Sequence, residues 1–217
     1  MKRIAIILSL FTVLLFSKTY AQQFNGGLIG GINGSEISGD YLSGPNKLGS
    51  YFGAFANVYI SQRKSLQMEM DFIQKGSRKV PGAGDTISGQ VYDYKLVLNY
   101  ISVPLLYKYD WTKNISFEGG PSFGFLLNSY EMSNGYVDDE VYGGDFNFLD
   151  FGLDLGMSFR FLLNWELNVR YSNTFFLTPV REHSGGATTW INKGQLNEVL
   201  SFTLHYTMFA RGRRWYE

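Results

Sequence analysis

The chain has 217 residues, with 19 basic and 19 acidic side chains and a formal net charge of zero. It has no cysteine, which excludes a disulfide framework, a thiolate metal site and a cysteine nucleophile. The balanced charge gives no reason to expect a nucleic acid as partner. Aromatic residues make up 17% of the chain and glycine contributes 25 residues. That composition is unusual for a soluble domain and typical of strands that face lipid.

The first 21 residues have the pattern of a secretory signal peptide. Lys2 and Arg3 precede an apolar run from Ile4 to Phe16, and a short polar stretch then leads to Ala21. The apolar run is shorter than the roughly twenty residues that a transmembrane helix needs. We therefore predict that residues 1–21 are removed and that the mature chain begins at Gln22, outside the cytoplasm.

The remaining chain alternates apolar and polar residues with a period of two, which is the signature of strands. In residues 66–72, every even-numbered side chain is Leu, Met or Phe and every odd-numbered one is Gln, Glu or Asp. Seven further segments show the pattern with varying clarity: 26–37, 49–60, 95–108, 114–128, 149–160, 165–172 and 200–208. We predict an all-β fold, an eight-stranded antiparallel up-and-down transmembrane β-barrel, over residues 22–211.

The predicted connections alternate between long and short. The long ones are 38–48, 77–94, 129–146 and 178–195, and the short ones are 61–64, 109–113 and 161–163. Outer-membrane barrels have short periplasmic turns and long extracellular loops. We therefore expect both termini and the short turns in the periplasm and the long loops outside the cell.

A soluble lipocalin-like barrel or a β-sandwich would also alternate, but it would bury its apolar face. Here one face of each strand is rich in Leu, Phe, Met and Tyr, while the other carries Gly, Ser and charges of both signs. A narrow polar interior inside an apolar wall explains this pattern best, so we favour the membrane barrel.

Four segments resemble the PorT-like outer-membrane β-barrel proteins of Bacteroidetes. They are GGLIGGINGS at 26–35, EMDFIQKG at 69–76, YISVPLLYKY at 100–109 and GGPSFG at 119–124. The resemblance runs from Phe24 to the region of Arg211. It implies a porin-like barrel in the outer membrane, and one branch of that family is associated with the type IX secretion pathway. It implies no particular activity.

The polar face of the predicted strands would line the barrel interior. An eight-stranded barrel is only wide enough for side chains to fill it. We therefore expect a structural charge network and no open channel, with an ion-selective pore as the alternative. The residues of this predicted network are Glu69, Asp71, Lys108, Glu118, Asp150, Asp154, Arg160, Glu166, Arg170 and His205.

Proline and glycine within the strands call for physical explanations. Pro104 has no N–H to donate to a ladder, so we expect a bulge or a strand end there. The glycines at 119, 120, 124, 152 and 156 are expected to relieve crowding in a small barrel.

No combination of residues predicts a catalytic, cofactor-binding or metal site. Aromatic residues in the predicted outer loops are candidate contact residues: Tyr41, Tyr92, Tyr130, Tyr136, Tyr142 and Trp190. Residues 212–217 form a basic and aromatic periplasmic tail. The contact candidates around it, for lipid headgroups or a partner subunit, are Arg211, Arg213, Arg214 and Trp215.

These features favour a non-enzymatic barrel that serves as a structural or accessory subunit of an envelope assembly, for protein secretion or outer-membrane protein insertion. The alternatives are a surface ligand-binding or adhesion barrel that uses its outer loops, and a small porin-like pore. The expected partners are outer-membrane lipid and other outer-membrane or periplasmic proteins, with no nucleic acid.

Overall fold

The computed structural model describes residues 24–38, 46–79, 86–87, 90–91, 93–133, 136–137, 146–182 and 194–209. The predicted signal peptide, 1–21, and the predicted tail, 212–217, lie outside these ranges. Within these ranges the regular secondary structure consists of strands alone. No helix in them is long and apolar enough to cross a membrane.

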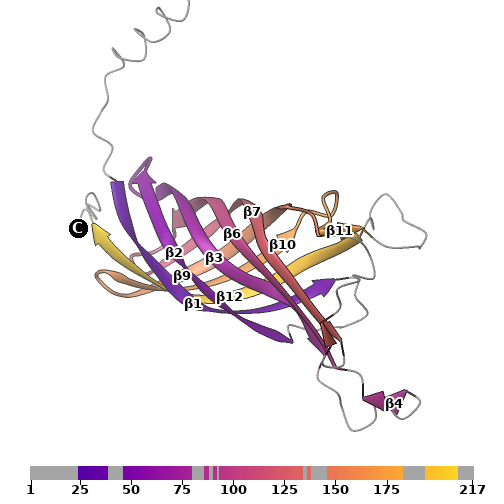
Figure 1. Cartoon of the computed structure of the whole chain (residues 1–217). Coiled ribbons are helices and arrows are strands. Elements are labelled where there is room, and N and C mark those ends of the chain that lie inside the picture. The colour runs from indigo at the N-terminus through magenta and orange to yellow at the C-terminus, as the bar shows by residue number, and fades with distance from the viewer. Residues whose placement is uncertain are drawn as a thin grey trace, which may run out of the picture.

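Eight long strands form a closed antiparallel barrel (Figure 1). Each pairs with the next long strand in the chain, and the last pairs with the first. The strands are β1 (Phe24–Ser38), β2 (Lys47–Tyr59), β3 (Lys64–Lys79), β6 (Tyr94–Asp110), β7 (Ile115–Ser133), β9 (Leu149–Leu162), β10 (Trp165–Thr174) and β12 (Gly194–Phe209). The predicted eight-stranded up-and-down barrel is confirmed.

Four short strands lie at one end of the barrel: β4 (Thr86–Ile87), β5 (Gln90–Val91), β8 (Tyr136–Val137) and β11 (Arg181–Glu182). β4 pairs with β5, β8 pairs antiparallel with β7, and β11 pairs antiparallel with β12. The predicted bounds of two long loops, 77–94 and 129–146, are wrong, because β3 and β7 continue beyond the predicted strand ends. Tyr130 therefore lies in a strand and not in a loop.

The two ends of the barrel differ in their connections. Phe24 of β1 pairs with Val58 beside the β2–β3 turn, and Gly26 pairs with Phe209 of β12. The first and last described strands therefore start and finish at the end that carries the short turns. We call this end the turn end and the opposite one the loop end.

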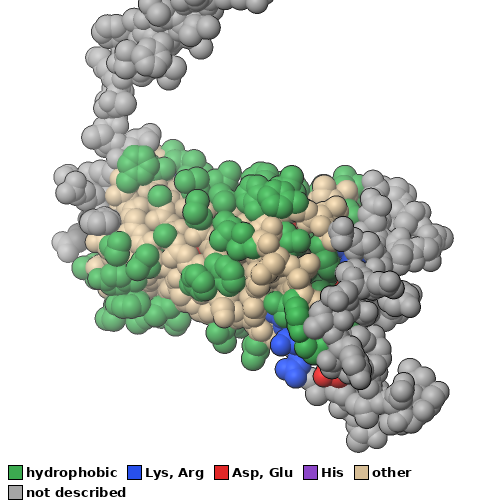
Figure 2. Space-filling view, in the orientation of Figure 1, with side chains coloured by type: hydrophobic (Ala, Val, Ile, Leu, Met, Phe, Trp, Pro, Cys, Tyr) green, Lys and Arg blue, Asp and Glu red, His purple; other side chains and the backbone are tan. Residues whose placement is uncertain are grey.

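The barrel wall is apolar on the outside and polar on the inside. Figure 2 shows hydrophobic side chains spread over the outer face, and Leu155 on that face is 67% exposed. Arg170, which points inward, is 2% exposed. A soluble barrel would show the reverse, because water would surround its outer face. This arrangement decides between the two interpretations of the alternation in favour of a lipid-facing wall.

Pro104 does not interrupt β6. Met68 of β3 pairs with Leu105 on one side of it, and Asp71 pairs with Ser102 on the other in the same register. The ladder to β3 only skips the proline and its neighbour. The predicted bulge or strand end at Pro104 is therefore wrong, since the flanking pairs hold the strand in place across a single gap.

Inward-facing glycines make room for the polar interior. A Cβ atom on Gly156 would lie 2.9 Å from Oε1 of Glu118, and one on Gly152 would lie 2.9 Å from Oγ of Ser122. Any larger residue at these two positions would displace a polar side chain of the interior. The predicted role of these glycines in relieving crowding is confirmed.

Candidate functional site

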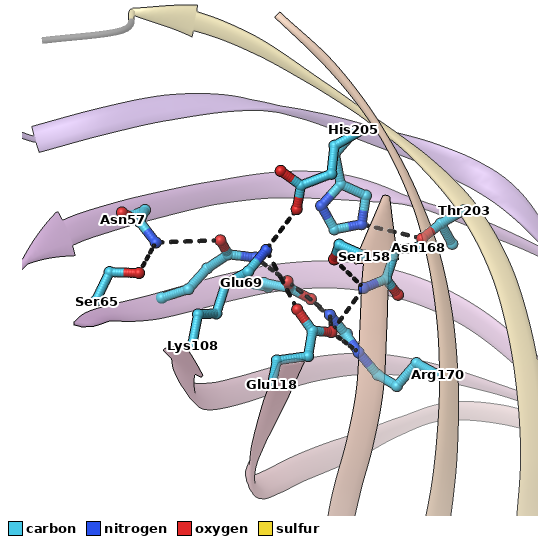
Figure 3. Close-up of polar contacts among 12 residues, drawn as sticks. Asn57, Ser65, Glu69, Lys108, Glu118, Ser158, Asn168, Arg170, Thr203 and His205 are labelled. Atoms are coloured by element: carbon cyan, nitrogen blue, oxygen red, sulfur yellow. Dashed lines mark hydrogen bonds and ion pairs between the residues drawn. The ribbon is translucent and has the colours of Figure 1, made fainter. Parts of the chain in front are cut away.

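Arg170 of β10 is the centre of a polar network in the barrel interior. Its Nη1 lies 2.6 Å from Oε2 of Glu69 on β3, and its Nη2 lies 2.6 Å from Oε1 of Glu118 on β7. Nη1 also donates a hydrogen bond of 3.1 Å to the hydroxyl of Tyr51 on β2. Figure 3 shows Arg170 directed at both Glu69 and Glu118. One guanidinium therefore links strands that lie on different sides of the barrel.

Lys108 of β6 continues the network toward the turn end. Its Nζ lies 3.3 Å from Oε2 of Glu118 (Figure 3). The same Nζ lies 2.8 Å from Oε1 of Glu166. The other carboxylate oxygen of Glu166 lies 2.7 Å from Nη2 of Arg160. The ion pairs thus run without a break from Arg160 through Glu166, Lys108, Glu118 and Arg170 to Glu69. Cations and carboxylates alternate along this chain, so its charges balance.

Neutral polar groups occupy further hydrogen-bonding positions around this chain. Asn168 donates to Oε1 of Glu118 at 2.9 Å and to Oγ of Ser158 at 2.8 Å. On β12, Thr203 and Nε2 of His205 lie 3.0 Å apart. Buried charges are tolerated only when they are paired and hydrogen-bonded, and these contacts supply such partners.

Asp150 of β9 anchors a second polar cluster nearer the loop end. It lies 2.8 Å from Nζ of Lys75, and it accepts hydrogen bonds from Thr174 at 2.7 Å and from Asn197 at 2.9 Å. Four strands therefore meet at one carboxylate. Because the partners of Asp150 come from three other strands, its carboxylate links the closing strand β12 to the middle of the sheet.

Two further carboxylates lie between these clusters. Oδ2 of Asp71 accepts a hydrogen bond of 2.9 Å from Tyr51, and Oδ1 of Asp154 accepts one of 2.9 Å from Ser122. Tyr51 therefore joins Asp71 to the guanidinium of Arg170. The polar interior is continuous from the turn end to the level of Asp71.

An apolar cluster fills the interior toward the loop end, where the sequence predicted only polar side chains. Its fully buried members near that end are Ile37, Leu96, Leu98, Tyr100 and Val199. The residues of 95–108 are apolar on both faces in this stretch, so the inward face could not be recognised from its polarity. Apolar packing is combined with an ion pair at this end of the barrel, where Nη2 of Arg181 on β11 lies 2.7 Å from Oε2 of Glu131 on β7.

A cavity of about 250 Å³ remains at the turn end. Lys108, Arg160, Glu166 and His205 contribute to its lining. On its inner side the ion pairs of Glu118, Arg170 and Glu69 cross the barrel. No sequence signal predicted this cavity, because its position depends on how far each strand extends at the turn end.

The structure places all ten predicted interior residues on the inner face of the barrel, and all except His205 take part in the ion pairs and hydrogen bonds above that cross between strands. Asp150 and Asp71 belong to this set. Sequence reasoning missed Tyr51 and Lys75 as partners. Lys75 lies three residues beyond the end of the clearly alternating segment 66–72, although its odd number matches the polar parity of that segment.

Two of the predicted contact residues lie within the described ranges. Tyr130 lies in β7 and Tyr136 in β8. The others lie outside the described residues: Tyr41, Tyr92, Tyr142, Trp190, Arg211, Arg213, Arg214 and Trp215. Across the described ranges there is no group of three or more His, Cys, Asp or Glu side chains that could hold a metal ion.

The model of a protein family, the outer membrane protein beta-barrel domain, matches residues 20–176 of the chain. The chain belongs to this family. Membership agrees with the closed barrel and its apolar outer wall, and it assigns this barrel to the outer membrane and its lipid. No curated protein sequence matches the chain.

Three solved structures show the range of similarity for this outer-membrane barrel. The attachment invasion locus protein Ail of Yersinia pestis is 11% identical over 86% of this chain and 99% of its own, with a TM-score of 0.45. Neisserial surface protein A is 14% identical over 86% and 97%, with a TM-score of 0.48. CarO of Acinetobacter baumannii is 9% identical over 88% and 100%, with a TM-score of 0.43.

Proposed function

We propose that this outer-membrane barrel is a closed, non-enzymatic subunit of an envelope assembly. The filled interior carries the proposal: ion pairs cross the lumen from Glu69 to Arg160, and apolar side chains pack at the loop end. A barrel whose interior is occupied by its own side chains offers other molecules its outer wall and its two ends. This argues against the porin-like pore and favours contacts made from outside.

The resemblance to PorT-like proteins refines the proposal. Within that branch the assembly would serve protein secretion or the insertion of outer-membrane proteins. Loop contacts with a ligand remain the alternative function, and the tail would contact periplasmic partners or lipid headgroups. The lipid-facing wall is the surface that a partner barrel or lipoprotein would meet inside the membrane.

Photo-crosslinking in native membranes tests the subunit role. A photoreactive phenylalanine analogue replaces Ala54 on β2 or Met157 on β9, two exposed positions that lie four strands apart around the barrel. We expect an adduct larger than the barrel from at least one of them, because a partner would cover part of the wall. The buried Ser158 is the matched control and should give no adduct. Monomer alone from both exposed positions, after illumination in the native host, would contradict the subunit role.

The proposed orientation places the loop end outside the cell and the turn end in the periplasm. Because the chain has no cysteine, single substitutions report on each end without background. Thr178→Cys at the loop end should react with a membrane-impermeant maleimide on intact cells. Ser61→Cys in the β2–β3 turn should react only after the outer membrane is permeabilised. The opposite labelling pattern would reverse the orientation.

A further inference from the structure

Two cations lie opposite each other on the outer face of the barrel at the loop end. Arg78 of β3 pairs in register with Lys95 of β6, and both side chains are exposed. Neither forms an ion pair within the described part of the chain. Like charges directly opposite on neighbouring strands destabilise the pair, so an anion bound between them would remove the repulsion. Figure 2 shows Lys or Arg side chains at this end of the barrel, with an Asp or Glu side chain close by.

A third basic residue lies on the inner side of the barrel wall near this pair. Lys47, at the start of β2, is 4% exposed, and its Nζ has no hydrogen-bond partner among the described residues. Its Cδ packs 3.1 Å from the place that a Cβ on Gly76 would take, two residues before Arg78. Lys95 is close enough to repel it electrostatically. A buried amine without a counter-ion adds positive potential where Arg78 and Lys95 already concentrate it.

On the outer face, the type of side chain changes in steps from the middle of the barrel toward these cations. Ile101 pairs with Phe125, which are apolar, and the next outward pair is Asn99 with Asn128. These amides form a row with Gln74: Gln74 Nε2 donates to Asn99 at 3.1 Å, and Asn99 Nδ2 donates to Asn128 at 2.6 Å. We take this row of side-chain amides, hydrogen-bonded across neighbouring strands, as the level at which the hydrocarbon layer ends.

An aromatic residue and then the cations follow beyond the amide row. Tyr130 pairs with Val97, one outward position above Asn99, and Lys95 is the next. Lys95 is four residues from Asn99, roughly 13 Å along the strand. Tyrosine is enriched at the membrane interface, and long basic side chains reach back to it from just outside. The side chains thus change from apolar to amide, then to aromatic and then to basic. A lipid lying against this wall would place its acyl chains on the apolar side chains and its phosphate beside the basic ones.

We propose that Arg78 and Lys95 bind the phosphate of an anionic lipid of the outer leaflet, a phosphorylated glycolipid of the lipid A type. The acyl chains would lie on the apolar wall below, over Phe72, Ile101 and Phe125. A guanidinium and an ammonium suit phosphate by charge and by hydrogen-bond geometry. The wall below the patch is what favours a lipid over free phosphate. The choice of leaflet rests on the proposed orientation.

Lipid titration of the detergent-purified full chain tests the site. The probes are bisphosphorylated lipid A, the same lipid after dephosphorylation, and inorganic phosphate, with bound lipid counted by native mass spectrometry. We expect lipid A to bind at least tenfold more tightly than its dephosphorylated form and more tightly than inorganic phosphate. The R78Q/K95Q variant should lose this preference, whereas R63Q/K64Q, with two exposed basic residues at the turn end, should keep it.

Three results would overturn the proposal. They are equal binding of both lipid forms by the natural chain, an unchanged preference in R78Q/K95Q, and inorganic phosphate that competes as well as lipid A. Because binding in detergent does not depend on orientation, these failures would leave the subunit role and the cysteine-labelling result untouched. Retained heat-modifiable migration in gels confirms that R78Q/K95Q is folded, since its two positions are exposed.

Discussion

Replacing Arg170 by methionine should lower the free energy of unfolding by about 3–5 kcal/mol. The change removes the one cation that pairs with both Glu69 and Glu118, so the buried Glu69 loses its cation and Glu118 keeps only Lys108, at 3.3 Å. Breaking one side of a buried ion pair costs far more than the pair contributes by itself. Urea titration of the barrel folded into phosphatidylcholine vesicles, followed by tryptophan fluorescence, measures the difference.

Two companion variants separate charge from packing at Arg170. The double change R170M/E69Q leaves two cations and two carboxylates in the chain from Arg160 to Glu118 and should recover most of the lost stability. Arg160→Met removes a cation whose side chain is 16% exposed and which pairs with one carboxylate only, so its cost should be smaller. If R170M cost no more than R160M, the ion-pair chain would not hold the interior together as argued above.

Replacing Leu155 by arginine should destabilise the barrel by about 2–4 kcal/mol in a lipid bilayer. Leu155 lies near the middle of β9 on the outer face, where it is 67% exposed. A charge there would sit in hydrocarbon, whereas the same substitution on a water-facing wall would be almost neutral. Reversible urea unfolding from vesicles again gives the free energy.

Leu163→Arg is the matched control for the lipid-facing wall. Leu163 is 90% exposed but lies in the β9–β10 turn at the end of the barrel. Because the cost of a charge falls toward the interface, this variant should lose about 1 kcal/mol or less. Similar small losses for both variants would show that Leu155 does not face hydrocarbon, and the membrane-spanning interpretation would then fail.

The interior shows how far sequence periodicity extends. Glu69, Lys108 and Arg170 could be assigned to the inner face because a strand alternates strictly and the outer parity of each segment was apolar. Their partners could not be assigned. Arg170 and Glu69 are 101 residues apart, and they meet because closure brings β3 and β10 to facing sides of the lumen. A one-dimensional pattern contains no information on that distance.

The loop end was the least predictable part of the described barrel. The segment that became β6 has apolar residues on both faces near Leu96 and Leu98, so the inward side could not be recognised. The continuation of β3 to Lys79 and of β7 to Ser133 was missed for a related reason. Beyond the hydrocarbon layer the outer face of a strand no longer meets lipid tails. The alternation of apolar and polar residues therefore weakens there, although the strand is still paired with its neighbours.

The amino-acid sequence by itself determined the number of long strands, their apolar and polar faces and the alternation of short and long connections, because each of these follows from local spacing. Only the tertiary structure decided which of the two faces points outward, which charges pair across the lumen, and where apolar side chains fill it. These depend on closure of β1 onto β12, which sets the barrel diameter and brings side chains far apart in the chain within hydrogen-bonding distance. The register of β3 against β6 aligned Arg78 with Lys95 above the apolar wall, a pairing that neither segment encodes alone.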